Sequence, residues 1–153
     1  MNLKTVWIVI LVAVLPFGLF AQEQANNSTL KGIWALKKTK HADGSIIDVP
    51  VGLFKLFDSD GTFSNVRVTP KGTILTHQGQ FEIDGNDGYT ETIQDQTRAA
   101  ALKPMNTKQT HLKYKLSEDG NTLTIEGEIL IDEGKFRFML YEIWEKIKLY
   151  QDN

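Results

Sequence analysis

The stretch Leu30-Lys31-Gly32-Ile33-Trp34-Ala35-Leu36 opens the folded part of the chain. Its even-numbered positions share one face of an extended strand, because side chains alternate with a period of two in β-structure. Outward from this stretch, the sequence repeats short alternating segments separated by Gly- and Asp-rich turns, and it closes with an aromatic segment at 136–147. The pattern predicts an all-β domain.

Eight strands are expected, at about 30–38, 51–57, 62–69, 73–84, 89–97, 110–116, 122–131 and 135–148. Turn signals such as Asp58-Ser59-Asp60-Gly61 and Glu118-Asp119-Gly120-Asn121 separate them. Gly79, in the middle of a clearly alternating strand, indicates a bend or bulge. The exception is 98–104, where Ala99-Ala100-Ala101-Leu102 before Pro104 predicts one short helical turn.

Short connections between consecutive strands predict an up-and-down antiparallel sheet, which loses its exposed edges by closing into a barrel. The expected fold is therefore an eight-stranded antiparallel up-and-down barrel. The interior of a barrel of this size is either filled by side chains or able to hold one small ligand.

Residues 1–21 have the features of a signal peptide: a positive charge at Lys4, a continuous apolar core at 6–15, and Pro16 and Gly18 before a cleavage site after Ala21. The alternative is a retained membrane anchor, but the apolar run is shorter than the roughly 20 residues of a spanning helix. We therefore expect export to the periplasm or medium, with no stable membrane span after cleavage. Residues 22–29 are expected to form a disordered leader, and 30–149 the barrel domain.

The composition limits the functions that are plausible for this chain. Its 153 residues suit one domain, and a net charge of −2 does not favour nucleic acid as a partner. The chain has no cysteine, and its three histidines show no metal-ligand spacing, so neither a metal nor a cofactor is expected. No nucleophile motif or phosphate-binding glycine loop is present, and we do not expect an enzyme.

Gly32-Ile33-Trp34 resembles the Gly-x-Trp signature of the calycins, the group that includes lipocalins, fatty-acid-binding proteins and avidins. Together with Asp60-Gly61-Thr62-Phe63, residues 79–83 and Trp144-Glu145-Lys146, the order of the strands resembles small secreted bacterial lipocalin-like domains. The resemblance implies that the tryptophan plugs one end of the barrel beneath a basic residue of the last strand. The plug would consist of Gly32, Trp34 and Lys146, with Lys148 as an alternative to Lys146.

Fatty-acid-binding proteins usually carry Arg-x-Tyr on the last strand, where this chain has Glu142-Ile143-Trp144. A carboxylate there would repel the headgroup of a fatty acid, so fatty-acid binding is not expected. If Glu142 points inward, it pairs with a buried Arg or Lys, or it meets a neutral or cationic ligand.

The leading functional hypothesis is non-covalent binding of a small, partly apolar molecule inside the barrel. The candidate lining residues are His77, Phe81, Tyr89, Glu91, Tyr114, Phe138 and Glu142.

Two other hypotheses stay open. One is a protein-interaction module with a filled core, which could form a homodimer through the apolar outer face of the last strand. The other is a small hydrolase or isomerase that uses Glu91 with Glu142 as an acid–base pair, unless Arg67, Arg98 or Arg137 bridges the two carboxylates.

Overall fold

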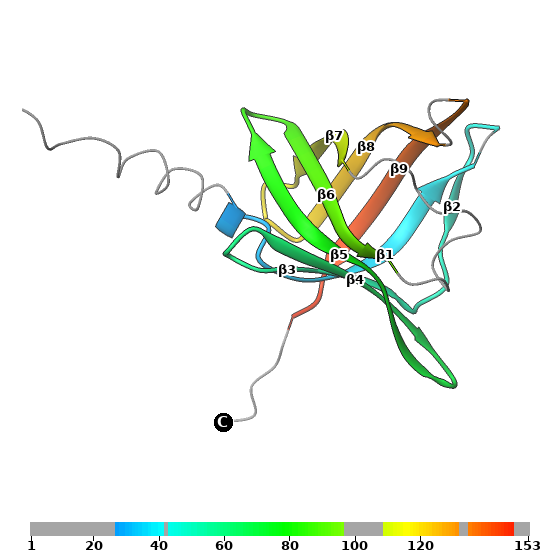
Figure 1. Ribbon diagram of the computed structural model, residues 1–153. Helices are drawn as coiled ribbons and strands as arrows, with labels where there is room; N and C mark the ends of the chain where they lie inside the picture. The colour runs from blue at the N-terminus through cyan, green and yellow to red at the C-terminus, as the bar shows by residue number, and fades with distance from the viewer. Residues whose placement is uncertain (1–26, 42, 97–108, 132–134, 149–153) are drawn as a thin grey trace, which may run out of the picture.

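The computed structural model describes residues 27–41, 43–96, 109–131 and 135–148. This part of the chain is all-β apart from a turn at 27–30 (Figure 1). The strands are β1 (Gly32–Lys40), β2 (Ile46–Asp48), β3 (Leu53–Phe57), β4 (Thr62–Thr69), β5 (Gly72–Asp84), β6 (Gly88–Gln96), β7 (Gln109–Leu116), β8 (Thr122–Ile131) and β9 (Phe136–Lys146).

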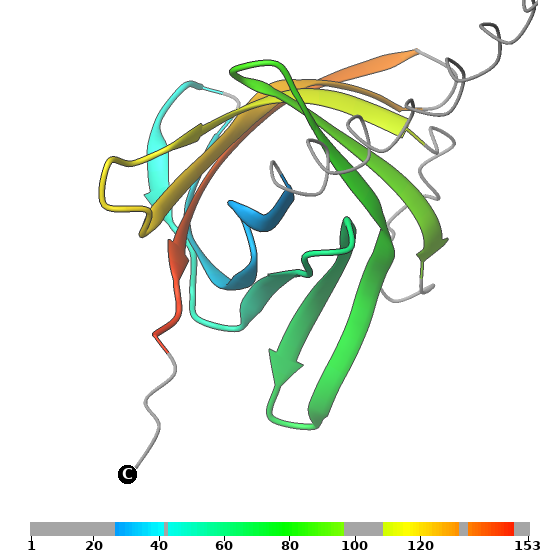
Figure 2. The same cartoon turned by 90° about the vertical axis from the view of Figure 1, so that its left-hand side faces the viewer.

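Each strand from β3 to β9 pairs antiparallel with the next along the chain, and β9 returns to pair with β1. This seam, which joins the first and last strands of the barrel, runs from Trp34 opposite Lys146 to Thr39 opposite Glu142. β2 and β3 both pair with β1, at its two ends, and act as one strand interrupted at 49–52. The prediction of a closed eight-stranded antiparallel up-and-down barrel is confirmed, and Figure 2 shows the strands as a ring around the turn at 27–30.

The bend expected at Gly79 is present as a break in register between Gln78 and Gly79, where β5 pairs with β6. A Cβ atom at Gly79 would lie 2.0 Å from the carbonyl oxygen of Thr92, so only glycine allows the two backbones to approach this closely. Two further register breaks lie at 36/38 in β1 and 65/66 in β4. Such bulges bend strands strongly enough to close a small barrel.

Trp34 lies inside the barrel, beneath a lysine of the last strand. Its side chain is fully buried, and its indole Nε1 donates a hydrogen bond to the carbonyl oxygen of Leu30 at 2.8 Å. The Nζ atom of Lys146 lies 5.2 Å from the centre of the ring. Gly32 has φ +136°, and a Cβ there would lie 2.9 Å from Cε of Lys146, so this position favours a glycine.

The turn at 27–30 differs from the disordered leader expected for 22–29. Asn27 and Leu30 are both buried, and the Leu30 amide donates to the Asn27 carbonyl at 3.3 Å. The end of the expected leader therefore packs against the barrel. Residues 1–26, and the expected helical turn at 98–104, lie outside the described residues. Within the described ranges, no helix has the length and apolar character needed to cross a membrane.

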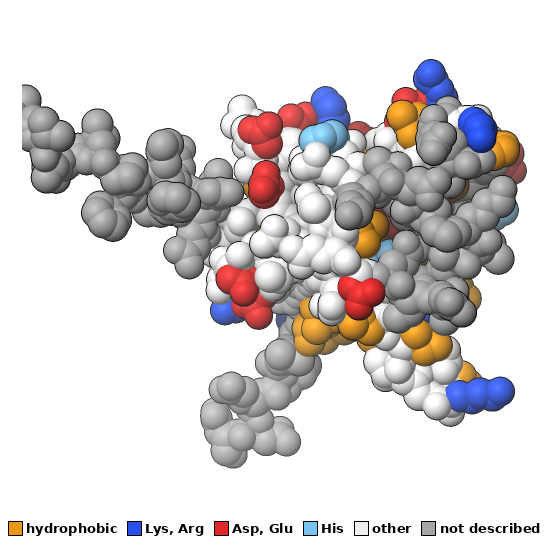
Figure 3. Space-filling model, in the orientation of Figure 1, with side chains coloured by type: hydrophobic (Ala, Val, Ile, Leu, Met, Phe, Trp, Pro, Cys, Tyr) orange, Lys and Arg blue, Asp and Glu red, His pale blue; other side chains and the backbone are white. Residues whose placement is uncertain are grey.

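Two hairpins extend beyond the ring of strands. In the β4–β5 hairpin, residues 72–75 of β5 pair with β4 but with no other strand of the described chain, and the apolar side chains Val68 and Leu75 are 47% and 37% exposed. Figure 3 shows hydrophobic side chains over the region where this hairpin projects, with a basic side chain at the tip. In the second hairpin, residues 127–131 of β8 and 136–140 of β9 pair only with each other among the described strands.

Candidate functional site

One half of the barrel is solid and the other half contains a cavity. Buried aromatic and aliphatic side chains fill the first half, among them Trp34, Phe57, Phe63, Phe81 and Tyr89. Phe57 and Phe81 pack edge to face, with ring centres 4.7 Å apart. On each of these strands, the residues toward the other end line the cavity instead: Leu36, Lys55, Asn65, His77 and Glu91.

The cavity has a volume of about 250 Å³. Apolar side chains line it together with nearly as many polar ones. The aliphatic residues include Leu36, Leu53, Ile93, Leu112, Ile129 and Leu140, and the polar ones are Lys55, Asn65, Arg67, Thr76, His77, Glu91, Thr110 and Glu142. Apolar walls with a few polar groups are typical of sites that bind small molecules.

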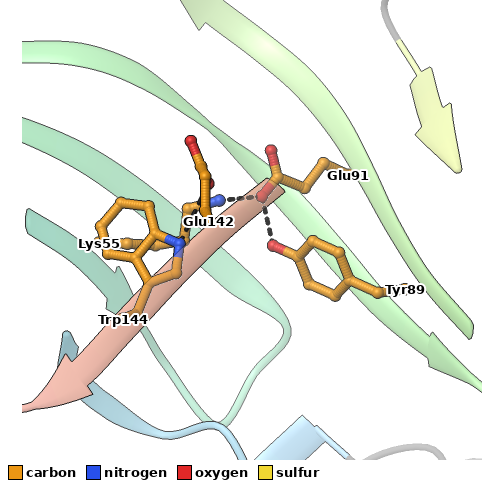
Figure 4. A network of polar contacts seen from close by, with 5 residues as sticks. All are labelled: Lys55, Tyr89, Glu91, Glu142 and Trp144. Atoms are coloured by element: carbon orange, nitrogen blue, oxygen red, sulfur yellow. Dashed lines mark hydrogen bonds and ion pairs between the residues drawn. The ribbon is translucent and has the colours of Figure 1, made fainter. Parts of the chain in front are cut away.

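A buried ion pair lies where the cavity meets the solid core (Figure 4). Lys55 Nζ donates to Glu91 Oε1, and the Tyr89 hydroxyl donates to the same oxygen. The Lys55 and Glu91 side chains are only 4% and 11% exposed. Burial, and then the adjacent Glu91 carboxylate, raise the pKa of Tyr89 well above its usual value, so this phenol remains a donor.

Aromatic rings surround the Lys55 ammonium, in addition to its carboxylate partner. Its Nζ lies between 5.4 and 5.7 Å from the centres of four rings, those of Phe57, Phe63, Tyr89 and Trp144. Cation–π attraction of this kind strengthens when water is excluded. These rings and Glu91 together compensate for the loss of water around the buried charge.

Glu142 is a second carboxyl group in the cavity. Its Oε2 accepts a hydrogen bond of 3.0 Å from the indole Nε1 of Trp144, as Figure 4 shows. Burial is the main cause that raises the pKa of Glu142, and the charge of Glu91 adds to it, whereas the charge of Lys55 opposes the shift. In the described part of the chain, no donor reaches the other oxygen of Glu142, Oε1.

Two more polar groups line the cavity between β4 and β5. His77 is half-buried, and desolvation lowers its pKa, which favours the neutral imidazole. The Asn65 backbone carbonyl accepts a hydrogen bond of 3.0 Å from Thr76. The side-chain Oδ1 of Asn65 is buried and has no hydrogen-bond partner among the described residues.

The structure brings together three of the seven residues expected to line the barrel: His77, Glu91 and Glu142. Phe81 and Tyr89 face inward but belong to the solid core. Tyr114 is partly buried and packs against the same core, away from the cavity.

The interior position expected for Phe138 is wrong. Phe138 lies opposite Ile129, so it has the inward register, but its side chain is 47% exposed. The reason is the length of the β8–β9 hairpin. Around Phe138 it extends past the ends of β1 and β7, so no third strand of the described chain covers this side chain. The alternation of the sequence gives the face of a strand correctly but does not show where the neighbouring strands end.

Lys55 is the main site residue that sequence reasoning missed. It occupies the central position of Leu53-Phe54-Lys55-Leu56-Phe57, a segment apolar on both faces, and it shares the inward face with Leu53 and Phe57. A lysine flanked by apolar residues on an inward face is a signal for a buried ion pair. Asn65 was also missed, and nothing in its sequence neighbourhood marks it.

The arginines expected to bridge the carboxylates do not do so in the described chain. Arg67 is exposed at the edge of the cavity. Arg137 pairs with Glu128 at 3.3 Å on the exposed hairpin. Arg98 lies outside the described residues.

Known proteins support this fold. A crystal structure of an uncharacterised protein from Bacteroides eggerthii matches with a TM-score of 0.55 and 15% sequence identity, over 77% of this chain and 99% of that chain. At that identity the likeness concerns the fold alone. No curated protein sequence is significantly similar to this chain. The family model described as "Domain of unknown function (DUF4488)" matches residues 29–153, so the chain belongs to the DUF4488 family.

Proposed function

We propose that this protein is an exported, lipocalin-like barrel that binds one small, partly apolar molecule in its cavity. The observation that carries the proposal is the cavity of about 250 Å³, whose lining combines aliphatic side chains with polar ones. Burial of an apolar body against these walls would supply affinity, and the polar groups would set orientation. The export part of the proposal comes from the signal-peptide pattern of residues 1–21.

The solid half of the barrel supports this proposal. Trp34, held by Leu30 and covered by Lys146, blocks that end, so a ligand would enter from the cavity end. The cavity-lining ends of the strands carry smaller or polar residues where the other half carries aromatic ones. This uneven filling supports a binding cavity over an interaction module with a filled core.

Titration with prodan, a neutral naphthalene fluorophore whose emission depends on the polarity of its surroundings, would test the proposal. We expect saturable binding of one molecule per chain, with a blue shift. Leu140→Trp, which places a large ring in the cavity, should weaken binding at least tenfold, or about 1.4 kcal/mol.

The matched control is Ile143→Trp. Ile143 lies on the same strand but is paired with Thr124, which puts it on the outer face. This variant should bind prodan like the wild type. Absence of saturable binding, or an equal effect of the two substitutions, would contradict the cavity as the binding site. Circular dichroism of both variants checks that the barrel is intact.

A further inference from the structure

Two hydrogen-bond acceptors in the cavity have no donor among the described residues. One is Glu142 Oε1, whose sister oxygen is bound by Trp144. The other is the side-chain oxygen of Asn65, which is buried. Glu142 lies on β9 and Asn65 on β4, and both line the same small cavity. A bound molecule able to donate to these acceptors would satisfy groups that the protein leaves without partners.

The charges around the cavity also favour a donor. Titratable side chains reach it from β3 (Lys55), β4 (Arg67), β5 (His77), β6 (Glu91) and β9 (Glu142). The other strands contribute none to its described lining. Lys55 is already paired with Glu91, and the exposed Arg67 lies at the edge. Glu142 is therefore the carboxyl group whose charge has no ion-pair partner within 4 Å in the described chain.

Building on the binding function proposed above, we propose that the ligand is an amphipathic amine whose ammonium group binds Glu142 and Asn65 and whose apolar body lies against the aliphatic walls. An ammonium group offers three donors and a positive charge. It can therefore donate to both acceptor oxygens and also neutralise the Glu142 carboxylate. A hydroxyl offers one donor and no charge, whereas a carboxylate offers no donor and carries a negative charge that Glu142 would repel. The indole of Trp144, beside Glu142, adds a surface that attracts cations.

The direction of the pKa shift at Glu142 agrees with this assignment and adds a linkage. Burial favours the protonated carboxyl in the empty cavity. An ammonium ion would favour the carboxylate, so amine binding should be accompanied by proton release. Affinity for an amine should therefore increase as pH rises through the titration of Glu142.

Octylamine, octanol and octanoate share one apolar chain and differ in the polar end, so they make a direct test by displacement of prodan. At pH 8 we expect octylamine to bind at least tenfold more tightly than octanoate, with octanol between them. Octylamine should bind more weakly at pH 5 than at pH 8. Its amine is charged at both pH values, so the difference would come from a group of the protein. In Glu142→Gln, the preference for the amine should fall at least tenfold and most of its pH dependence should be lost.

Glu145→Gln is the control, because Glu145 lies on the same strand, exposed, and pairs with Lys37 outside the barrel at 3.3 Å. It should keep the wild-type ranking. Octanoate binding as tightly as octylamine, or a ranking unchanged in Glu142→Gln, would overturn the amine assignment while the cavity proposal stands. The pH comparison on the wild type gives a test that needs no variant, and an affinity for octylamine equal at both values would also overturn the assignment. Failure of prodan and all three probes to bind would overturn both proposals.

Discussion

The buried pair of Lys55 and Glu91 makes a sharp prediction about stability. The Lys55 and Glu91 side chains are only 4% and 11% exposed in the wild type. Lys55→Met therefore leaves the Glu91 carboxylate buried without its partner, and Glu91→Gln leaves the Lys55 ammonium in the same position. Removing one partner of a buried ion pair typically costs about 3–5 kcal/mol. The double variant removes both charges of the pair, and its glutamine can still accept from Tyr89, so it should cost less than either single variant.

Urea unfolding followed by tryptophan fluorescence measures these free energies, because Trp34 and Trp144 are buried. Lys113→Met is the surface control. Lys113 and Asp87 form a pair of similar type at 3.0 Å, but their side chains are 69% and 61% exposed, so water screens it and its loss should cost about 0–1 kcal/mol. The reasoning fails if Lys55→Met costs no more than Lys113→Met, or if the double variant equals the sum of the singles.

Three further substitutions test other parts of the structure. Gly79→Ala places a Cβ atom 2.0 Å from the Thr92 carbonyl oxygen. In urea unfolding it should lower the free energy of unfolding by about 3 kcal/mol, or the protein should not fold. A loss below about 1 kcal/mol would count against this close approach of the two strands. Trp34→Phe leaves the Leu30 carbonyl without its donor and should cost about 2–3 kcal/mol in the same assay, whereas wild-type stability would show that the indole bond is unimportant. Glu142→Gln removes a carboxyl group whose pKa is raised above 4.5 in the folded state. Because the folded wild type binds more protons there, its stability should fall relative to Glu142→Gln as pH rises above about 4.5, and a difference that is constant from pH 4 to 8 would contradict this.

The sequence predicts the barrel because the physical signals are local. Alternation gives each strand its inward face, and short turns force neighbours to be antiparallel. Gly79 reveals its bulge because no other residue fits there easily. The contact between Trp34 and Lys146 was expected only from the resemblance to calycins.

The site was predicted in part, for an equally physical reason. The inward faces of β5, β6 and β9 identify His77, Glu91 and Glu142, but alternation carries no information on depth along the barrel axis. Depth depends on stagger between strands, which is why Tyr89 belongs to the core and Phe138 lies beyond the ring. The partner of Glu91 is also set by stagger, so the arginines named as possible bridges did not point to Lys55.

The seam between β1 and β9 has a consequence for how the protein is made. Its two strands come from opposite ends of the domain, Gly32–Lys40 and Phe136–Lys146. Every other strand pairing of the barrel joins consecutive strands, when β2 and β3 are counted as the one interrupted strand. During synthesis on the ribosome, the N-terminal strand emerges first and its closing partner emerges last. The growing chain thus lacks the partner of its first strand for almost the whole of translation. Chaperones that hold nascent chains are therefore expected to matter more for this barrel than for a domain whose strand pairings are all local.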